Sequence, residues 1–438
     1  MNAKKHIYAI EGARGLAAYY ILFHHAFFLV NNGQYFSTNW AIRLIHDFSA
    51  GFPIHILMMF FLLSGFSIHY ANYGRIQSFE WASFKSYYYK RIRRIYPIYL
   101  LAVALSLIAI IILQQLQPEN NWTLPARIQL SGTILLFSDL ESRSGTWVPT
   151  LSTNGPLWSL SYEALYYLLY PFFSVMVIKK GMFTALWISV AISAVAVLFA
   201  SIFGPTQISN MLSLYVLWCL GAFIAALKIE GRRFHFEPIN IFVLTFVWAQ
   251  GLWIFATFLL WRIPMGFYLY AGIFIFLVML NGVVGVWPDK WSTRDRFIGC
   301  VSAVGCSAVL LYVSYRFGVT QNFEFLWIRM GLTLLIGLLW LFTKPASLFN
   351  WIKRCFNRWH STGVYSYGLY VLQFPLMIIA YVFAEKYLGS VLWGFASIGL
   401  AVLVAKLVEQ KLQPEIARYL DSVLRSHQAP PARSSVTD

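Results

Sequence analysis

The chain has 438 residues, of which 59% are hydrophobic and only 11% charged, and its mean hydropathy is +0.62. This composition excludes a water-soluble globular protein and predicts an all-α, polytopic membrane protein built as a helical bundle. The formal net charge is +16, but the basic residues fall in short connections between apolar runs. That distribution indicates membrane topology, with lipids as neighbours, and argues against a nucleic-acid partner.

About twelve apolar runs are long enough to span a bilayer, which takes about 20 residues. They lie near residues 7–30, 52–71, 96–116, 157–178, 183–203, 211–228, 239–260, 265–287, 297–318, 325–343, 364–384 and 389–409. One or two are expected to be interfacial or re-entrant, which leaves about 10–12 spans, and a shorter piece at 128–138 is interpreted as re-entrant.

Lys and Arg gather in alternate connections, so the positive-inside rule predicts an even number of crossings with both termini in the cytoplasm. Residues 1–412 are expected to form one membrane-embedded domain. Residues 413–438 are expected to form a cytoplasmic tail that is partly disordered, because the last dozen residues are polar and rich in Pro and Ser.

The first run carries Glu11, Arg14, His24 and His25. Ionisable groups inside a span are costly, so they are candidate functional residues. At about 100° per residue, Arg14 and His25 fall within about 20° of each other, whereas His24 points roughly 80° away. Glu11 shares the face of Arg14. Along the axis Arg14 and His25 lie roughly 16 Å apart, about half the hydrocarbon thickness.

Two further segments have both an ordinary and a functional interpretation. The pair Ser64 and Gly65 in the second run lets a neighbouring helix or a slender ligand approach closely, and helix packing is the commoner role. A basic stretch with Arg91, Arg93 and Arg94 precedes the third apolar run. Arg91 and Arg94 share a helical face. Arginine suits phosphate, although an ordinary positive-inside anchor has the same composition.

Polar residues also open the fourth run and a late run. The fourth begins Trp158-Ser159-Leu160-Ser161-Tyr162-Glu163. Helical rise places Glu163 about 9 Å below the outer surface, where a carboxyl is either neutral or paired. The late run begins with Tyr365 to Pro375 and includes Tyr367. Its polar groups are expected to face a neighbouring helix, and helix packing is the simpler explanation. The remaining His and Cys residues show no ligand spacing, so no metal is expected.

Taken in chain order, these segments resemble the acyltransferase-3 family of integral-membrane acyltransferases. Glu11 to His25 is similar to its first-helix signature, in which an Arg or Lys and a His are separated by ten residues, a spacing that selects His25. The other similarities are Phe60 to Phe66 (FFxLSGF), Arg91 to Pro97 (RxxR), Trp158 to Glu163 (WSLSVE) and Tyr365 to Pro375 (SYxLYLxHxP). The ordered set covers residues 11 to about 375.

The sequence departs from the family pattern at three positions. Glu11 stands where Asp is usual, which is a mild change. Ala164 stands where a second acidic residue is usual. Gln373 stands where His is usual, which removes any titrating role there. The family also usually has about ten spans. The twelve candidate spans counted here therefore imply either extra helices between Phe234 and Thr343 or an overcount.

The resemblance implies an O-acyltransferase of the bacterial inner membrane. It would move an acyl group, expected to be acetyl, from cytoplasmic acyl-CoA to a hydroxyl of an extracytoplasmic glycan or lipid-linked saccharide. His25 would act as general base or as a transient acyl carrier, with the base role preferred. Glu11 would pair with Arg14. The residues expected to bind the donor are Arg14, Arg91, Arg93, Arg94, Ser64 and Gly65. Those expected to bind the acceptor are Glu163, Trp158, Ser161, Tyr162 and Tyr367.

Two other classes stay open at this point. A transporter or flippase for a glycan or lipid-linked sugar would use Glu11, Arg14 and His25 as a relay, although such folds often show an internal repeat and none is visible here. A non-catalytic partner of polysaccharide assembly is the third class. Of the three, only the enzyme would consume labelled acetyl-CoA and label a glycan.

Overall fold

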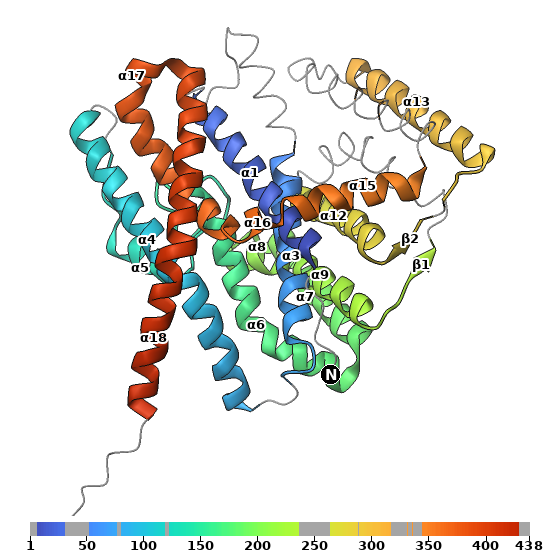
Figure 1. Ribbon diagram of the computed structural model, residues 1–438, viewed down its shortest axis with the longest axis horizontal. Helices are drawn as coiled ribbons and strands as arrows, with labels where there is room; N and C mark the ends of the chain where they lie inside the picture. Colours follow the sequence, from blue (N-terminus) through green and yellow to red (C-terminus); the bar gives the residue numbers. More distant parts are fainter. Residues whose placement is uncertain are drawn as a thin grey trace, which may run out of the picture.

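The computed structural model describes residues 7–30, 52–76, 80–118, 122–235, 263–287, 289–316 and 344–428, with residues 331 and 335. Over these residues the protein is a bundle of α-helices with one small two-stranded sheet (Figure 1). Seven of the described helices are long and apolar enough to cross a membrane. The expected class, an all-α membrane bundle, is therefore confirmed. The runs at 239–260 and 325–343 lie outside the described residues, apart from those two single positions.

The N-terminal half contains α1 (Tyr8–Val30), α3 (Pro53–Asn72), α4 (Trp81–Leu116), α5 (Arg127–Ile134), a short 3-10 turn (Gly155–Leu157), α6 (Trp158–Lys180), α7 (Met182–Phe203), α8 (Gln207–Ser213) and α9 (Tyr215–Ile229). The C-terminal half contains β1 (Phe234–His235), α12 (Gly266–Val284), β2 (Gly285–Val286), α13 (Thr293–Arg316), α15 (Pro345–Arg358), α16 (His360–Gly363), α17 (Ser366–Leu407), a π-helical turn (Val408–Leu412) and α18 (Gln413–Gln428). The strands β1 and β2 pair in parallel, which brings the C-terminal ends of α9 and α12 together.

Helix α4 is longer than the apolar run at 96–116 predicted. It has 36 residues and begins at Trp81. The basic stretch before the run continues the same helix, because Lys and Arg have good helix propensity. Pro97 lies inside this helix and has no N–H to donate to the carbonyl of Arg93, which instead accepts from Nε2 of Gln413 at 2.9 Å. The arginines are therefore fixed on a helix that packs within the bundle, rather than in a connecting loop.

The core between α3, α6 and α9 is aromatic and closely packed. Tyr162, Tyr166 and Trp218 are fully buried in it. The backbones of α3 and α9 approach closely because Gly65 and Gly221 face the opposite helix. A Cβ on Gly65 would lie 1.9 Å from the carbonyl oxygen of Trp218. Gly65 therefore serves helix packing, the commoner of the two roles considered above, and does not open a passage for a ligand.

Replacing Gly65 by alanine is expected to destabilise the protein by about 1–3 kcal/mol, the usual cost of overpacking a core. The check is thermal unfolding of the purified protein in detergent. Gly399 on α17 is the matched control, because a Cβ there meets no atom within 4 Å. Gly399→Ala should leave stability unchanged or raise it by about 0.5–1 kcal/mol. Equal melting temperatures for the two variants would contradict this account.

Helix α17 folds back on itself as a hairpin (Figure 1). On a straight helix Gly368 and Glu409 would lie about 60 Å apart, yet the N–H of Gly368 donates to Oε1 of Glu409 at 2.8 Å. The rings of Tyr381 and Trp393 also meet, with centroids 5.1 Å apart. The two arms correspond to the predicted runs at 364–384 and 389–409.

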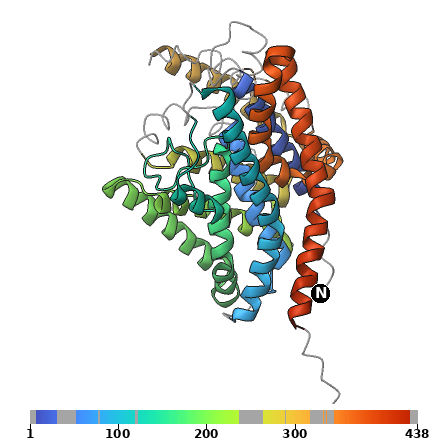
Figure 2. The ribbon, with the colours of Figure 1, turned by 90° about the vertical axis from the view of Figure 1, so that its left-hand side faces the viewer.

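The C-terminal arm continues through the π-helical turn into α18, which packs along α4 (Figure 2). Residues 413–428 of the predicted tail are thus helical. Asp421 on α18 accepts hydrogen bonds from Tyr89 (2.8 Å) and from Arg93 on α4. The end of the described chain is thereby joined to the basic part of α4.

The segment around 128–138, interpreted above as re-entrant, packs into the bundle beside α4. It begins with the eight-residue helix α5. The carbonyl of Thr133 then accepts a hydrogen bond of 2.5 Å from Tyr99 on α4. Tyr99 lies about 25 Å along the helix axis from the end of α4 at Leu116. The segment therefore descends beside α4, and it supplies non-helical backbone inside the bundle next to the start of α6.

Candidate active site

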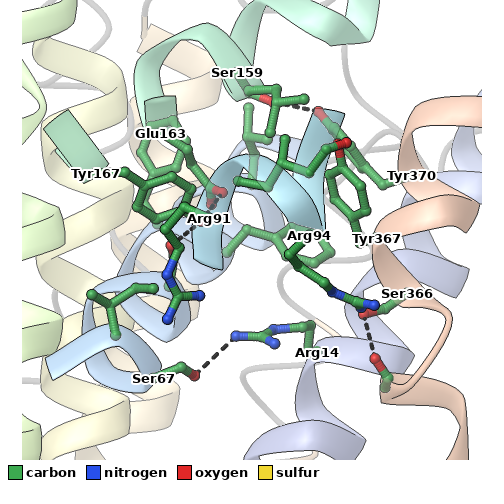
Figure 3. A pocket seen from close by; sticks show the side chains of 18 of the residues that line it. Arg14, Ser67, Arg91, Arg94, Ser159, Glu163, Tyr167, Ser366, Tyr367 and Tyr370 are labelled. Atoms are coloured by element: carbon green, nitrogen blue, oxygen red, sulfur yellow. Dashed lines mark hydrogen bonds between the residues drawn. The ribbon is translucent and has the colours of Figure 1, made fainter. Parts of the chain in front are cut away.

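A cavity of about 250 Å³ lies between α1, α3, α4, α6 and the start of α17. Its charged lining residues are Arg14, Arg91, Arg94 and Glu163. Its hydroxyl groups come from Ser64, Ser67, Ser159, Tyr167, Ser366, Tyr367 and Tyr370. Figure 3 shows the three guanidinium groups gathered toward one end, with Glu163 and Ser159 toward the other. The arginines, predicted to lie at a common site, are separated by up to 80 positions in the sequence.

Arg14 reaches the cavity because the glycines beside it hold α1 close to its neighbours. A Cβ on Gly12 would lie 1.8 Å from the carbonyl oxygen of Phe356, and a Cβ on Gly15 would lie 1.8 Å from Oγ1 of Thr362. These two close approaches fix the position of α1, and Nη2 of Arg14 then donates to Oγ of Ser67 at 2.9 Å. The ion pair of Arg14 with Glu11 stays a prediction.

The three arginines of α4 do not share one environment. Arg91 and Arg94 both line the cavity, as their shared helical face predicted. Nε of Arg91 is buried and has no hydrogen-bond partner among the described residues. Nη1 of Arg94 donates to Oε2 of Glu409 at 2.8 Å. Arg93, grouped with them from the sequence, faces away from the cavity and forms an ion pair with Asp421. Helical periodicity explains the division, because neighbouring residues point about 100° apart.

Glu163 faces the same cavity as the arginines, whereas the sequence placed it on an acceptor path from the outer side. Tyr167 donates to its Oε2 at 2.7 Å. The Tyr167 hydroxyl also lies 2.8 Å from Oγ of Ser64, which in turn accepts from the indole of Trp218 at 3.3 Å. This chain of hydrogen bonds fixes the carboxyl, and the charge of Arg14 interacts with it across the cavity.

Only part of the motif at the start of α6 lines the cavity. Ser159 does so, and its Oγ lies 2.7 Å from the hydroxyl of Tyr370 on α17. Trp158, Ser161 and Tyr162, predicted to bind the acceptor, are not among the lining residues. A helical wheel centred on Glu163 would have selected the residues four before and four after it, Ser159 and Tyr167. That periodic signal was available in the sequence.

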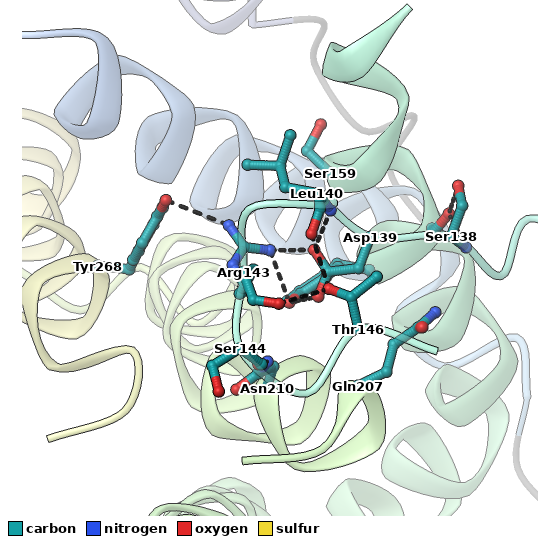
Figure 4. Close-up of polar contacts among 12 residues, drawn as sticks. Ser138, Asp139, Leu140, Arg143, Ser144, Thr146, Ser159, Gln207, Asn210 and Tyr268 are labelled. Carbon is teal, nitrogen blue, oxygen red and sulfur yellow. Dashed lines mark hydrogen bonds and ion pairs between the residues drawn. The ribbon is translucent and has the colours of Figure 1, made fainter. Parts of the chain in front are cut away.

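Trp158 and Tyr162 instead contact Arg143, which lies in the loop that follows the 128–138 segment. Figure 4 shows Arg143 among its polar partners Asp139 and Tyr268. The Arg143 guanidinium forms an ion pair with buried Asp139 and lies 4.0 Å from the centre of the Trp158 ring. It also donates to the hydroxyls of Tyr162 (3.0 Å) and Tyr268 (3.1 Å). These contacts tie the loop after the 128–138 segment to α6 and α12.

Ser161 holds the re-entrant segment as well. Its Oγ accepts from the backbone N–H of Ser138 at 3.1 Å. Trp158, Ser161 and Tyr162, the three motif residues outside the cavity, therefore all lie where α6 contacts the stretch of chain that precedes it. Tyr367, which was also predicted to bind the acceptor, does line the cavity, and its hydroxyl donates to the carbonyl of Ile95 at 2.9 Å.

His25 lies about three turns beyond Arg14 on α1 and does not line the cavity. Its ring packs edge-on against Phe374 of α17, with centroids 5.2 Å apart, and Gln373 lies beside it. Nδ1 of His25 is buried without a hydrogen-bond partner among the described residues. Tyr370, which lines the cavity, precedes Gln373 by about one helical turn. The imidazole thus faces α17 inside the bundle, about one turn from the cavity wall.

These features define a membrane protein with a cationic cavity between its helices and a buried imidazole close to it. The chain belongs to the acyltransferase-3 family, whose model, described as an acyltransferase domain, matches residues 7–294. The protein is therefore an acyltransferase and an integral membrane protein. No curated protein and no solved structure is detectably similar to it. Tyr367, Gln373 and Glu409 lie beyond the matched residues.

Proposed function

We propose that the protein transfers an acyl group, expected to be acetyl, from acyl-CoA to a hydroxyl of an extracytoplasmic glycan or lipid-linked saccharide. It would do so in the bacterial inner membrane, with both termini in the cytoplasm. The observation that carries the proposal is the convergence of Arg14, Arg91 and Arg94 on one cavity inside the bundle. Membership of the acyltransferase-3 family supports the reaction class.

Acyl-CoA suits this cavity because one end of the molecule is polyanionic and the other end is narrow. Arginine binds phosphate oxygens through paired N–H donors, and Nε of Arg91 still lacks a partner among the described residues. The cavity of about 250 Å³ is smaller than common ligand pockets, which measure about 300–1,000 Å³. It therefore fits part of the donor, with the thioester end directed past Ser159 and Tyr370 toward His25.

The chemical step would be a direct transfer. The acceptor oxygen attacks the thioester carbonyl carbon while a neutral imidazole nitrogen of His25 takes the hydroxyl proton. The carbon–sulfur bond then breaks, and the sulfur leaves with a proton as free CoA. Glu163, held by Tyr167, would orient the acceptor together with Tyr367. Trp158, Ser161 and Tyr162 would support the acceptor path by holding the re-entrant segment.

The test is to incubate the purified full chain with labelled acetyl-CoA and a glycan acceptor. The expected result is loss of the thioester and a labelled sugar ester. If the thioester stays intact while reconstituted vesicles move the saccharide across the membrane, the transporter alternative replaces the proposal. If the sugar ester forms, mass spectrometry of surface glycans with and without the protein would identify the natural acceptor.

Arg91→Ala is expected to raise the KM for acyl-CoA about 10- to 100-fold, because a hydrogen bond to a charged group contributes about 1.5–3 kcal/mol. Arg14→Ala should act in the same direction. The KM for the acceptor should change much less in both variants. Arg93→Ala is the matched control on the same helix, since Arg93 faces α18. A larger effect on the acceptor, or an equal effect of Arg93→Ala on acyl-CoA, would contradict the donor assignment.

A further inference from the structure

A second cavity, of about 470 Å³, lies where the C-terminal ends of α9 and α12 meet α15. None of its lining residues also lines the first cavity. The pairing of β1 with β2 holds the ends of α9 and α12 together, and α15 packs against α1. This second cavity is therefore formed by fixed elements and is separate from the proposed donor site.

Its lining is strongly basic. Four cationic side chains contribute, namely Lys228, Arg232, Arg233 and Lys353, and none of the described lining residues is acidic. Arg232 is neutralised by Glu230 at 2.8 Å. Lys353 and Arg233 are close enough to Lys228 for their charges to act on it. Such mutual repulsion is relieved when an anion occupies the space between the cations.

The cavity also has an aromatic wall. The rings of Trp287 and Phe349 stack with centroids 3.9 Å apart, and both line the space. Tryptophan is enriched where a membrane protein meets the lipid headgroups. The cavity lies at the C-terminal ends of two stretches that are long and apolar enough to span, Gln207–Ile229 (α8 with α9) and Gly266–Val284 (α12). The ends of such spans are expected at the level of the headgroups.

Helix α15 supports the same placement. Its sequence, PASLFNWIKRCFNR, alternates apolar and basic positions at helical spacing, and Trp351 is 57% exposed. Figure 1 shows α15 lying across the direction of α3 rather than along it. An amphipathic helix with basic and aromatic residues that lies across the spans is typical of the membrane interface.

We propose that this second cavity binds a phosphate ester, and that its source is the headgroup of an anionic phospholipid. Basic pockets between membrane-spanning helices are suited to such headgroups. Lys353 from α15 and Arg233 from the turn after α9 would bind the phosphate oxygens, and the Trp287 ring would pack against the glycerol region. The proposal is independent of the donor assignment, since the two cavities share no residue.

The experiment is native mass spectrometry of the delipidated full chain with added phosphatidylglycerol. The wild-type protein is expected to retain the lipid, and a double variant, Arg233→Glu with Lys353→Glu, should bind at least tenfold more weakly. Arg354→Glu is the matched control, because Arg354 neighbours Lys353 on α15 but does not line the cavity. Equal lipid retention in all three proteins overturns the proposal.

A competition experiment distinguishes a lipid headgroup from a soluble phosphate as the natural ligand. Adenosine 3′,5′-bisphosphate and inorganic phosphate are added to the lipid-bound wild-type protein. Persistence of the lipid supports the proposed source. Displacement by the bisphosphate, with the same dependence on Arg233 and Lys353, overturns the lipid source and assigns the cavity to a soluble phosphate ester. Thermal unfolding checks that the double variant is folded, and Lys353→Gln alone replaces it if it is not.

Discussion

Replacing His25 by alanine is expected to lower the rate of acyl transfer about 100- to 10,000-fold, the usual contribution of a general base. The imidazole lies inside the bundle against α17, and its Nδ1 has no partner among the described residues. Removing the ring deletes the proton acceptor without disturbing Arg14 or the cavity. The measurement is release of CoA from labelled acetyl-CoA by purified variants. The KM for acyl-CoA should stay close to the wild-type value.

His24→Ala is the matched control for that variant. The two rings are neighbours with centroids 5.5 Å apart, but helical geometry directs them to different faces of α1. We expect His24→Ala to retain most of the activity. Normal transfer in His25→Ala, or equal losses in both variants at equal membrane insertion, would remove His25 from the mechanism.

Replacing Glu409 by alanine is expected to reduce both stability and the use of acyl-CoA, although this residue does not line the cavity. Its side chain is fully buried, and it accepts hydrogen bonds from Arg94 and from the backbone N–H of Gly368, each at 2.8 Å. Without it, Arg94 loses the group that positions its guanidinium. Because Arg94 is 45% exposed, we expect a loss of about 1–3 kcal/mol in stability and a roughly tenfold rise in the KM for acyl-CoA.

A double-mutant cycle tests whether Glu409 acts through Arg94. Coupled residues give non-additive losses, so Arg94→Ala with Glu409→Ala should raise the KM little more than Arg94→Ala alone. Glu415→Ala on α18 is the control, because Glu415 is an exposed carboxylate that pairs with Arg418. Exposed ion pairs contribute about 0–1 kcal/mol. Fully additive effects of the two substitutions would show that Glu409 has only a structural role.

Local periodicity was enough to predict much of the site. The spacing of Arg14 and His25, and the shared face of Arg91 and Arg94, follow from helix geometry alone. The same geometry, applied to the motif that ends at Glu163, would have found Ser159 in place of its neighbours. The fold class followed from composition, since the apolar runs require a membrane.

The contacts that the sequence did not reveal are those between distant segments. Glu409 lies 315 positions from Arg94, and no short motif marks it. The start of α4 at Trp81 was not predicted, because the apolar run begins only near residue 96 and the charged residues before it do not show that the helix is continuous. Gln373 is an intermediate case. The family resemblance marked the position, and only the structure places it beside His25.

The C-terminal stretch of the chain fixes two of the arginines on α4 through ion pairs. Glu409 and Asp421 lie on one helical stretch and hold Arg94 and Arg93, two adjacent residues of α4 that point in different directions. The segment matched by the family model ends at residue 294, so it supplies the cations but not the carboxylates that fix them. The shape of the cationic end of the cavity therefore depends on residues outside the matched segment, and two proteins alike only in their family segment need not have the same shape there.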